Sequence, residues 1–161
     1  LHHDRGQAAG EREMTKQDEI NIDVATDPRL LASVRGLVRT YLQTEGFSSE
    51  RASEIVLAVD EACTNAIRHA YGGNTAARLS LTVREQDSAI EFIVKDDGVP
   101  VALEKCERRA VAAPDPTSLK PGGLGVQLIY SVFDEVEFHP GETSGNRVVM
   151  RVKRPEKKAA Q

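Results

Sequence analysis

The feature that most constrains this chain is an amphipathic stretch near its middle. Residues 55–71, IVLAVDEACTNAIRHAY, place their apolar side chains along one arc when successive residues turn by about 100°, as in an α-helix. An arc of this width is typical of a helix that faces a hydrophobic core. The arc consists of Ile55, Val56, Val59, Ala62, Cys63, Ala66 and Ala70.

Polar residues flank this arc. Glu61 and Asn65 stand one turn apart beside it, Arg68 follows one turn later, and His69 lies near its edge. A helix that only packs against a core has no need of such a row. A helix that presents a base and a metal-binding amide to a ligand does need one. The stretch therefore predicts both a core element and one wall of a site.

Capping residues set the limits of the first helices. Asp27 before Pro28 is typical of an N-cap and a first helical residue, which predicts a helix over 28–44. Ser48 or Ser49 can cap the central helix, which is expected to run to the end of the stretch described above. The side chains expected to be buried in the first helix are Leu30, Leu31, Val34, Leu37, Val38, Tyr41 and Leu42.

Alternation of apolar and polar residues predicts five strands. These strands cover 19–25, 77–84, 89–95, 135–139 and 147–153, and residues 85–88 form the turn between the second and the third. The Pro-, Ala- and Gly-rich residues 110–123 predict a long loop, which in a compact domain is a functional lid or is disordered. We expect a short helical turn within 101–109 and a helix over 126–133.

The order of these elements predicts the fold class. A strand, two helices, a hairpin, a loop, a helix and a second hairpin favour an α+β protein, a two-layer α/β sandwich with a mixed, mostly antiparallel sheet and helices on one face. A doubly wound parallel sheet would need alternating strand–helix units, which the sequence lacks. We expect one domain over 20–153, between a disordered leader, 1–19, and a charged tail, 154–161. Met14 is a plausible native start, which leaves the status of 1–13 open.

Composition narrows the function classes. A formal net charge of −4 and an aromatic content of 4% argue against direct nucleic-acid binding. No apolar run approaches the length of a membrane span, so no membrane association is expected. Cys63 and Cys106 are far apart and form no metal-binding spacing, which predicts reduced thiols in a cytoplasmic protein.

Three clusters along the chain could carry chemistry. Glu61 and Asn65 could supply a general base and an oxygen ligand for a divalent ion; alternatively, they are a solvated acid and a tolerated amide. Residues 96–98, DDG, follow a strand, where a carboxylate can accept a hydrogen bond from an exocyclic amine and a glycine admits a flat ring; alternatively, they form a tight turn. Residues 122–125, GGLG, open a helix whose bare N–H groups can bind phosphate; alternatively, these glycines only end a loop.

The order of these clusters resembles the GHKL, or Bergerat, ATP-binding fold, which histidine-kinase catalytic domains and gyrase-type ATPases share. Within that group the chain is similar to the anti-sigma-factor serine kinases of the RsbW and SpoIIAB type. Their N-box, S/D-E-A-x-T-N-A-x-x-H-A/G-Y, matches residues 60–71, DEACTNAIRHAY. Their glycine box, G-G-L-G followed by a helix and M/F-D-E-V, matches residues 122–125 and 133–136.

The resemblance implies a role for each matched residue. Glu61 is expected to be the general base that accepts the proton of a substrate serine hydroxyl, and Asn65 is expected to hold the Mg²⁺ that accompanies ATP. Asp96 is expected to accept a hydrogen bond from the adenine amino group, with Gly98 beneath the ring. The phosphate is expected to bind the backbone N–H groups of Gly123, Leu124, Gly125 and Val126.

Three departures from the family pattern bear on nucleotide affinity. Pro100 stands in place of the second glycine of D-x-G-x-G, and Asn146 in place of a hydroxyl in the last strand's G-T-T-V motif. An arginine that some members carry before the glycine box is also missing. Lys120, Arg108 or Arg109 could replace it; alternatively, each is a solvated cation.

The resemblance predicts an anti-sigma factor that is also an ATP- and magnesium-dependent protein serine kinase. Such a protein sequesters an RNA polymerase sigma factor and phosphorylates a STAS-domain antagonist in a partner-switching pathway. It works as a homodimer, and exposed apolar residues of the first helix could serve that interface. The identity of the sigma factor, the antagonist and the upstream signal stays open, as does whether the output is transcription or another partner switch.

A function of a different class is a kinase-inactive, nucleotide-dependent module that only sequesters its partner. The presence of both Glu61 and Asn65 argues against it, because such a module has no chemical need for a base. The catalytic half of a histidine kinase is also disfavoured, because no predicted upstream helix carries a phosphoacceptor histidine. His2 and His3 lie in the leader, and His69 belongs to the N-box.

Overall fold

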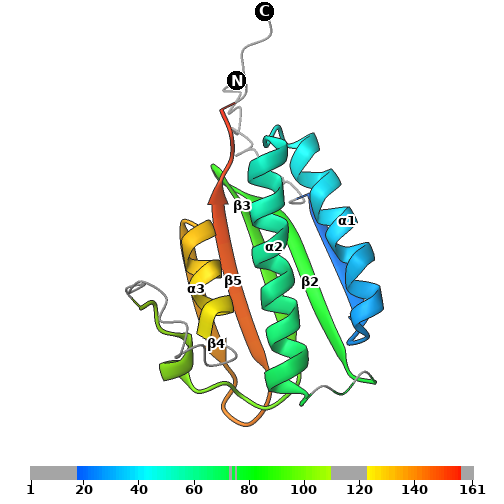
Figure 1. The fold of residues 1–161 in the computed structure, drawn as a ribbon, viewed down its shortest axis with the longest axis vertical. Helices are drawn as coiled ribbons and strands as arrows, with labels where there is room; N and C mark the ends of the chain where they lie inside the picture. The colour runs from blue at the N-terminus through cyan, green and yellow to red at the C-terminus, as the bar shows by residue number, and fades with distance from the viewer. Residues whose placement is uncertain (1–17, 73, 75, 110–122, 157–161) are drawn as a thin grey trace, which may run out of the picture.

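The computed structural model describes residues 18–72, 74, 76–109 and 123–156. The predicted leader up to residue 17, most of the long loop and the end of the tail lie outside the described residues. The described elements form two layers, one of strands and one of helices, as Figure 1 shows.

A five-stranded sheet forms the first layer. The strands are β1 (Glu19–Ala25), β2 (Arg78–Gln86), β3 (Ala89–Asp96), β4 (Glu135–Pro140) and β5 (Asn146–Lys153). They lie in the order β1-β2-β3-β5-β4, and each pair of neighbours is antiparallel. The predicted α+β two-layer class is confirmed. The sheet is antiparallel rather than mixed, because the β4–β5 turn reverses the chain before β5 pairs with β3.

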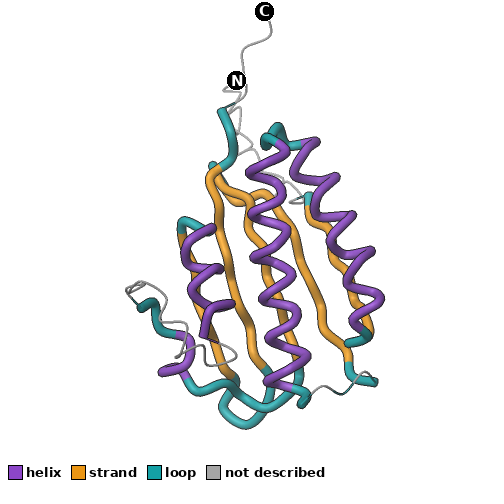
Figure 2. The backbone as a smooth tube through the Cα atoms, in the orientation of Figure 1, coloured by secondary structure: helices purple, strands orange, loops and turns teal. Residues whose placement is uncertain are grey.

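Three α-helices cover one face of this sheet. They are α1 (Pro28–Thr44), α2 (Ser49–Asn65) and α3 (Gly123–Val132), and α2 lies between the other two (Figures 1 and 2). A π-helix, η1 (Ala66–Ala70), continues α2, and a 3₁₀-helix, η2 (Leu103–Cys106), precedes the long loop. The largest fully buried side chains come from both layers and include Leu42, Ile55, Leu81, Ile90, Phe92, Ile129 and Met150.

Helix α1 spans the residues predicted for it. The Asp27 side chain accepts a hydrogen bond from the backbone N–H of Arg29 at 3.0 Å, and Pro28 takes the first helical position. The prediction that Leu30 and Leu37 are buried is wrong, since they are 42% and 38% exposed. The helix contacts the core along one narrow stripe, and the residues of that stripe are Leu31, Val34, Val38 and Leu42.

Helix α2 confirms the predicted arc and corrects its end. Every residue of the arc is buried, and Ser48 caps the helix by accepting from Arg51 N at 3.2 Å. An α-helix was expected up to Tyr71, but α2 ends at Asn65 and the next five residues form the π-helix η1. Such a widened turn is rare and occurs mostly at functional sites. Here it begins directly after the amide of the predicted metal ligand.

Other boundaries shift by a few residues. Strand β2 reaches Gln86, so the β2–β3 hairpin turns at Asp87-Ser88, where Asp87 has a φ of 53°. Helix α3 begins at Gly123 instead of Val126, so Gly123, Leu124 and Gly125 of the glycine box are part of its first turn. The predicted helical turn within 101–109 is η2.

Candidate functional site

The polar flank of α2 is half-buried. Glu61 and Asn65 are partly exposed, whereas the arc beside them is buried. The Asn65 Oδ1 atom is itself buried and has no hydrogen-bond partner among the described residues. A buried acceptor without a partner is unfavourable and calls for an explanation. Hard divalent cations take oxygen ligands of this kind, so the donor set fits a bound Mg²⁺.

The glycine box lies against this flank. A Cβ atom placed on Gly125 would contact Glu61 Oε2 and would lie 3.4 Å from Glu61 Cδ and 3.7 Å from Asn65 Nδ2. Glycine therefore lets α3 approach α2 here without displacing the Glu61 side chain. The tertiary fold places the first turn of α3 beside Glu61 and Asn65, although about sixty residues separate them in the chain.

The first turn of α3 has the chemistry of an anion site. The first four N–H groups of a helix have no intrahelical acceptor, and the helix dipole favours negative charge there. In α3 these groups belong to the predicted phosphate residues, Gly123 to Val126. The Leu124 side chain is 61% exposed and Val126 is buried, so one face of the turn stays open. Both features are compatible with the predicted phosphate contact, which stays a prediction.

The D-x-G turn holds a buried carboxylate. Asp96 ends β3 and is 9% exposed. Its Oδ1 atom accepts hydrogen bonds from Gly98 N at 2.9 Å and from Asn146 Nδ2 at 3.0 Å. Burial raises the pKa of the Asp96 carboxyl above its ordinary value, and the hydrogen bonds from Asn146 and Gly98 act in the opposite direction.

The same turn packs against the end of η1. A Cβ atom on Gly98 would lie 2.6 Å from the carbonyl carbon of Ala70, so glycine is required by this close approach. The Val99 N–H donates to the Ala70 carbonyl at 2.9 Å and satisfies a helix-end acceptor. The helical stretch α2–η1 thus contacts the glycine box at one end of its polar flank and the D-x-G turn at the other.

Two residues that sequence reasoning left without a role hold the D-x-G turn. The Tyr71 hydroxyl accepts from Asp97 N at 2.7 Å and donates to the Arg78 carbonyl at 2.6 Å. Asn146 contacts Asp96 directly. Tyr71 was visible as the last residue of the N-box and Asn146 as a departure from the last-strand motif. Neither pattern says what the side chain meets, because each partner lies in another element.

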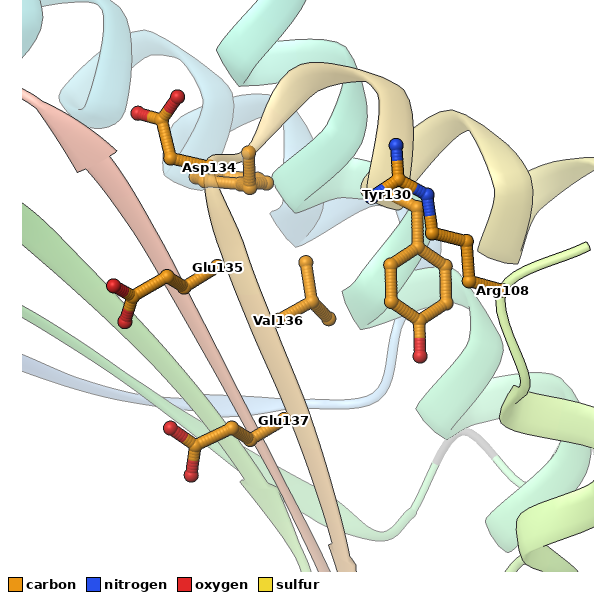
Figure 3. Close-up of a pocket in the computed structure, with 7 residues that line it drawn as sticks. Arg108, Tyr130, Asp134, Glu135, Val136 and Glu137 are labelled. Atoms are coloured by element: carbon orange, nitrogen blue, oxygen red, sulfur yellow. The ribbon is translucent and has the colours of Figure 1, made fainter.

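The cations considered for the phosphate are not placed there by the described residues. Arg108 lines a cavity of about 370 Å³ between α3 and β4. In Figure 3 the Arg108 side chain lies beside Tyr130, and Glu135 and Glu137 lie on the other side of the cavity. No residue predicted to bind the nucleotide lines this cavity. The backbone N–H of Arg109 donates to Gln127 Oε1 at 2.9 Å. Lys120 lies outside the described residues, so the identity of a phosphate-binding cation stays open.

Two further observations bear on the kind of site. Within the described part of the chain, no group of three or more His, Cys, Asp or Glu side chains could hold a metal ion. A divalent ion that is shared with nucleotide phosphates does not need such a group, because Mg²⁺ uses few protein ligands. No helix among the described residues is long and apolar enough to cross a membrane.

Fold and site together define a class of protein. A five-stranded antiparallel sheet carries helices on one face, an E-x-x-x-N flank, a buried D-x-G carboxylate and a glycine-opened helix. The family of histidine kinase-like ATPase domains matches residues 24–152, and the chain belongs to this family. The resemblance expected from the motifs is confirmed.

Within this family the chain is similar to a particular group of proteins. It is 29% identical over 129 residues to serine-protein kinase RsbW of Oceanobacillus iheyensis, covering 78% of this chain and 82% of the relative. It is 29% identical over 131 residues to serine-protein kinase RsbW of Bacillus subtilis, with the same coverage, 78% and 82%. It is 28% identical over 141 residues to serine-protein kinase RsbW of Listeria innocua, covering 84% and 87%.

Solved structures support the fold. The SiaB–SiaC complex from Pseudomonas aeruginosa matches with a TM-score of 0.63 and 16% identity, over 83% of this chain and 88% of that chain. The structure of the RsbU and RsbW domains of a Mycobacterium tuberculosis protein matches with a TM-score of 0.56 and 15% identity, over 89% of this chain and 34% of that chain. At these identities the likeness concerns the fold alone.

Proposed function

We propose that this chain is an ATP-dependent serine-protein kinase that controls a partner protein by phosphorylating it. One observation carries most of this proposal: the bare backbone of Gly125 packs on the side chains of Glu61 and Asn65. A nucleotide whose phosphates contact the first turn of α3 would therefore have a carboxylate and an unpartnered amide oxygen beside them. The curated relatives are named serine-protein kinases, which favours the same reaction.

Each residue has one task in this proposal. Asp96 accepts a hydrogen bond from the exocyclic amine of adenine, and Gly98 leaves room for the ring. The N–H groups of Gly123 to Val126 donate to phosphate oxygens. Asn65 holds Mg²⁺, which when bound supplies positive charge to the triphosphate. Glu61 accepts the proton of the substrate serine, because it is the carboxylate beside the phosphate-binding turn.

The partners belong to the finer part of the proposal. The substrate is a STAS-domain antagonist, and the other partner is an RNA polymerase sigma factor that the kinase sequesters. Unphosphorylated antagonist competes the sigma factor away, and phosphorylation ends that competition. The relatives are named serine-protein kinases, which supports the phosphorylation step of this pathway. With such partners, the proposed location is the cytoplasm.

We also propose that the chain works as a homodimer. Leu30 and Leu37 are both exposed and lie seven residues apart on α1, about two turns along one side of the helix, so they are available for contact with a second copy. Sedimentation of the wild-type chain and of a Leu30→Ser, Leu37→Ser variant tests this. A monomeric wild type would contradict the dimer, and a variant that stays dimeric would place the interface elsewhere.

The decisive experiment measures transfer of label from γ-labelled ATP and Mg²⁺ to the cognate antagonist. We expect Glu61→Gln to lower the transfer rate by about 10²- to 10⁴-fold, because a positioned base contributes this much, while ATP affinity changes little. Glu54→Gln is the matched control: the same change on the same helix, at an exposed side chain whose ion pair among the described residues is with Arg51.

Two outcomes would contradict parts of the proposal. If label stays off the antagonist while the complex still forms, the chain is the kinase-inactive sequestering module. If Glu61→Gln transfers phosphate as fast as Glu54→Gln, then Glu61 is not the base, whatever the overall activity.

A further inference from the structure

Asn146 makes more hydrogen bonds at the D-x-G turn than any motif predicts. Its Nδ2 group donates to Asp96 Oδ1 and to the Val99 carbonyl, both at 3.0 Å. Its Oδ1 atom accepts from Val101 N at 2.8 Å. Both N–H bonds of the amide are therefore used, and it has no donor left for a bound ligand.

The two outer contacts of Asn146 bracket Pro100. Proline has no N–H and a fixed φ, so the turn that contains it has one donor fewer to hold it in place. The Asn146 amide spans this gap, because it binds the carbonyl before Pro100 and the N–H after it. Pro100 and Asn146 both depart from the family pattern, and the structure links them, because Asn146 binds both neighbours of Pro100.

The neighbouring residue strengthens the same contact. Gly145 has a φ of +84°, and its N–H donates to the Gly98 carbonyl at 2.7 Å. A Cβ atom at this position would lie 3.0 Å from the Asp96 carbonyl oxygen. The Gly145–Asn146 pair at the end of the β4–β5 turn therefore packs directly on the backbone and the side chain of the D-x-G turn.

This contact orients the Asp96 carboxylate. Asp96 and Asn146 lie opposite each other in the antiparallel pairing of β3 with β5. Oδ1 receives both the Gly98 N–H and the Asn146 amide, while Oδ2 has no side-chain hydrogen-bond donor among the described residues. The oxygen that remains for a ligand is thus Oδ2, and it can only accept when the carboxylate is ionised.

We propose that Asn146 is the positioning residue of the base site, which aims Asp96 Oδ2 at the ligand and so sets the preference for a 6-amino purine over a 6-oxo purine. The inference rests on the proposed nucleotide-dependent function. An amino group donates to Oδ2, whereas a carbonyl oxygen at the same place repels it. Asn146 acts through Asp96 and does not touch the base, because its own donors are engaged.

The test compares ATP and GTP binding by the full chain, measured by calorimetry, in three variants. Asn146→Leu keeps the size and removes every hydrogen bond. Asn146→Thr keeps one hydroxyl donor for Asp96 but cannot span Pro100. Asn21→Leu is the matched control, since Asn21 lies on β1 and contacts Glu19 and Thr82, away from the turn.

We expect Asn146→Leu to weaken ATP binding at least about tenfold, as for a lost hydrogen bond to a charged group, with little change in GTP binding. Asn146→Thr should keep most of the preference for ATP. Asn21→Leu should leave both affinities unchanged.

Several outcomes would overturn the inference. Equal weakening of ATP and GTP in Asn146→Leu would mean that the residue only supports the turn. If Asn146→Thr loses as much of the preference for ATP over GTP as Asn146→Leu does, then the hydrogen bond to Asp96 does not set this preference. A wild-type chain that binds no ATP would overturn both the proposed function and this inference. If the wild type binds ATP and only the Asn146 variants give one of the results above, the inference fails and the proposed function stands.

Discussion

At the scale of single residues, the Asp96 carboxylate has one oxygen already committed. Oδ1 accepts from Gly98 and Asn146, so a proton added to this carboxyl goes to Oδ2 and turns the remaining acceptor into a donor. Burial raises the Asp96 pKa above 3.8. The proposed contact with an amino group therefore requires a pH above the raised pKa of Asp96, which is higher than the pKa of an ordinary aspartate.

This protonation predicts a pH dependence of nucleotide binding. ATP affinity should fall as the pH falls through the raised pKa of Asp96, because the ionised form is the one that accepts. Calorimetric titrations at a series of pH values measure this. Asp97 lies beside Asp96, so Asp97→Asn checks that the neighbouring carboxylate is not the titrating group. An affinity that is flat across this pH series would contradict the role of Asp96.

Replacement of the same carboxylate separates binding from folding. Asp96→Asn keeps an oxygen for Gly98 and Asn146 but places an amide donor where Oδ2 was, so ATP affinity should fall at least about tenfold. The folded-state pKa is raised, which means that ionisation of Asp96 opposes folding as the pH rises. The variant should therefore unfold at a higher urea concentration than the wild type at pH 7. This gain should vanish below pH 3.8, because the Asp96 carboxyl of the wild type is then protonated in both the folded and the unfolded state. A variant that binds ATP normally would exclude Asp96 from the base site.

At the scale of elements, the contact between α3 and α2 accepts a glycine without any shift of the Glu61 side chain. Gly125→Ala would place a methyl group on the Glu61 carboxylate, which is the end of a flexible side chain and can move aside. We expect the fold to survive and the transfer rate to fall by about 100-fold, the cost of a misplaced catalytic group. ATP affinity should change much less than this rate.

A second glycine offers the matched control. Gly36 lies inside α1, and nothing is found within 4 Å of a Cβ atom added there. Gly36→Ala should therefore raise the free energy of unfolding by about 0.5–1 kcal/mol, as expected for glycine in a helix interior, and leave phosphate transfer unchanged. If Gly125→Ala also left the transfer rate unchanged, the position of Glu61 would not matter for catalysis.

At the scale of the whole molecule, one buried charge joins four strands on the face without helices. Glu91 on β3 is 1% exposed and accepts from Arg84 on β2 at 2.7 Å and from Arg151 on β5 at 2.6 Å. Arg151 also pairs with Glu135 and Glu137 on β4. Adjacent residues of a strand point to opposite faces, so this network lies behind Phe92 and the core.

This network predicts a large loss of stability without a loss of binding. Glu91→Gln should lower the free energy of unfolding by about 3 kcal/mol, at the lower end for a broken buried pair because both arginines keep contact with water. Glu135→Gln is the control, since its side chain is 66% exposed and its pair should contribute less than about 1 kcal/mol. Urea unfolding measures both. ATP affinity should be the same in the two variants, and equal stabilities would contradict a structural role for Glu91.

The local elements of this fold follow from local patterns. The cap at Asp27, the apolar arc of α2 and the alternation in β1 involve neighbours in the chain, so the sequence predicts them nearly to the residue. The composition of the candidate site follows in the same way, because its three clusters are short motifs. Their order along the chain is what suggested a nucleotide site.

Long-range contacts decided the rest. The exposure of Leu37, the packing of Gly125 on Glu61 and the three side-chain hydrogen bonds of Asn146 each depend on a segment that is distant in sequence. The periodicity of a helix states which residues share a face, but it does not state how wide a stripe the neighbouring layer covers. A motif likewise names a side chain without naming its partner. The sequence by itself thus determined which groups the site contains, and the tertiary structure decided how they face one another, because hydrogen bonds and close contacts between layers form only when the sheet and helices have packed.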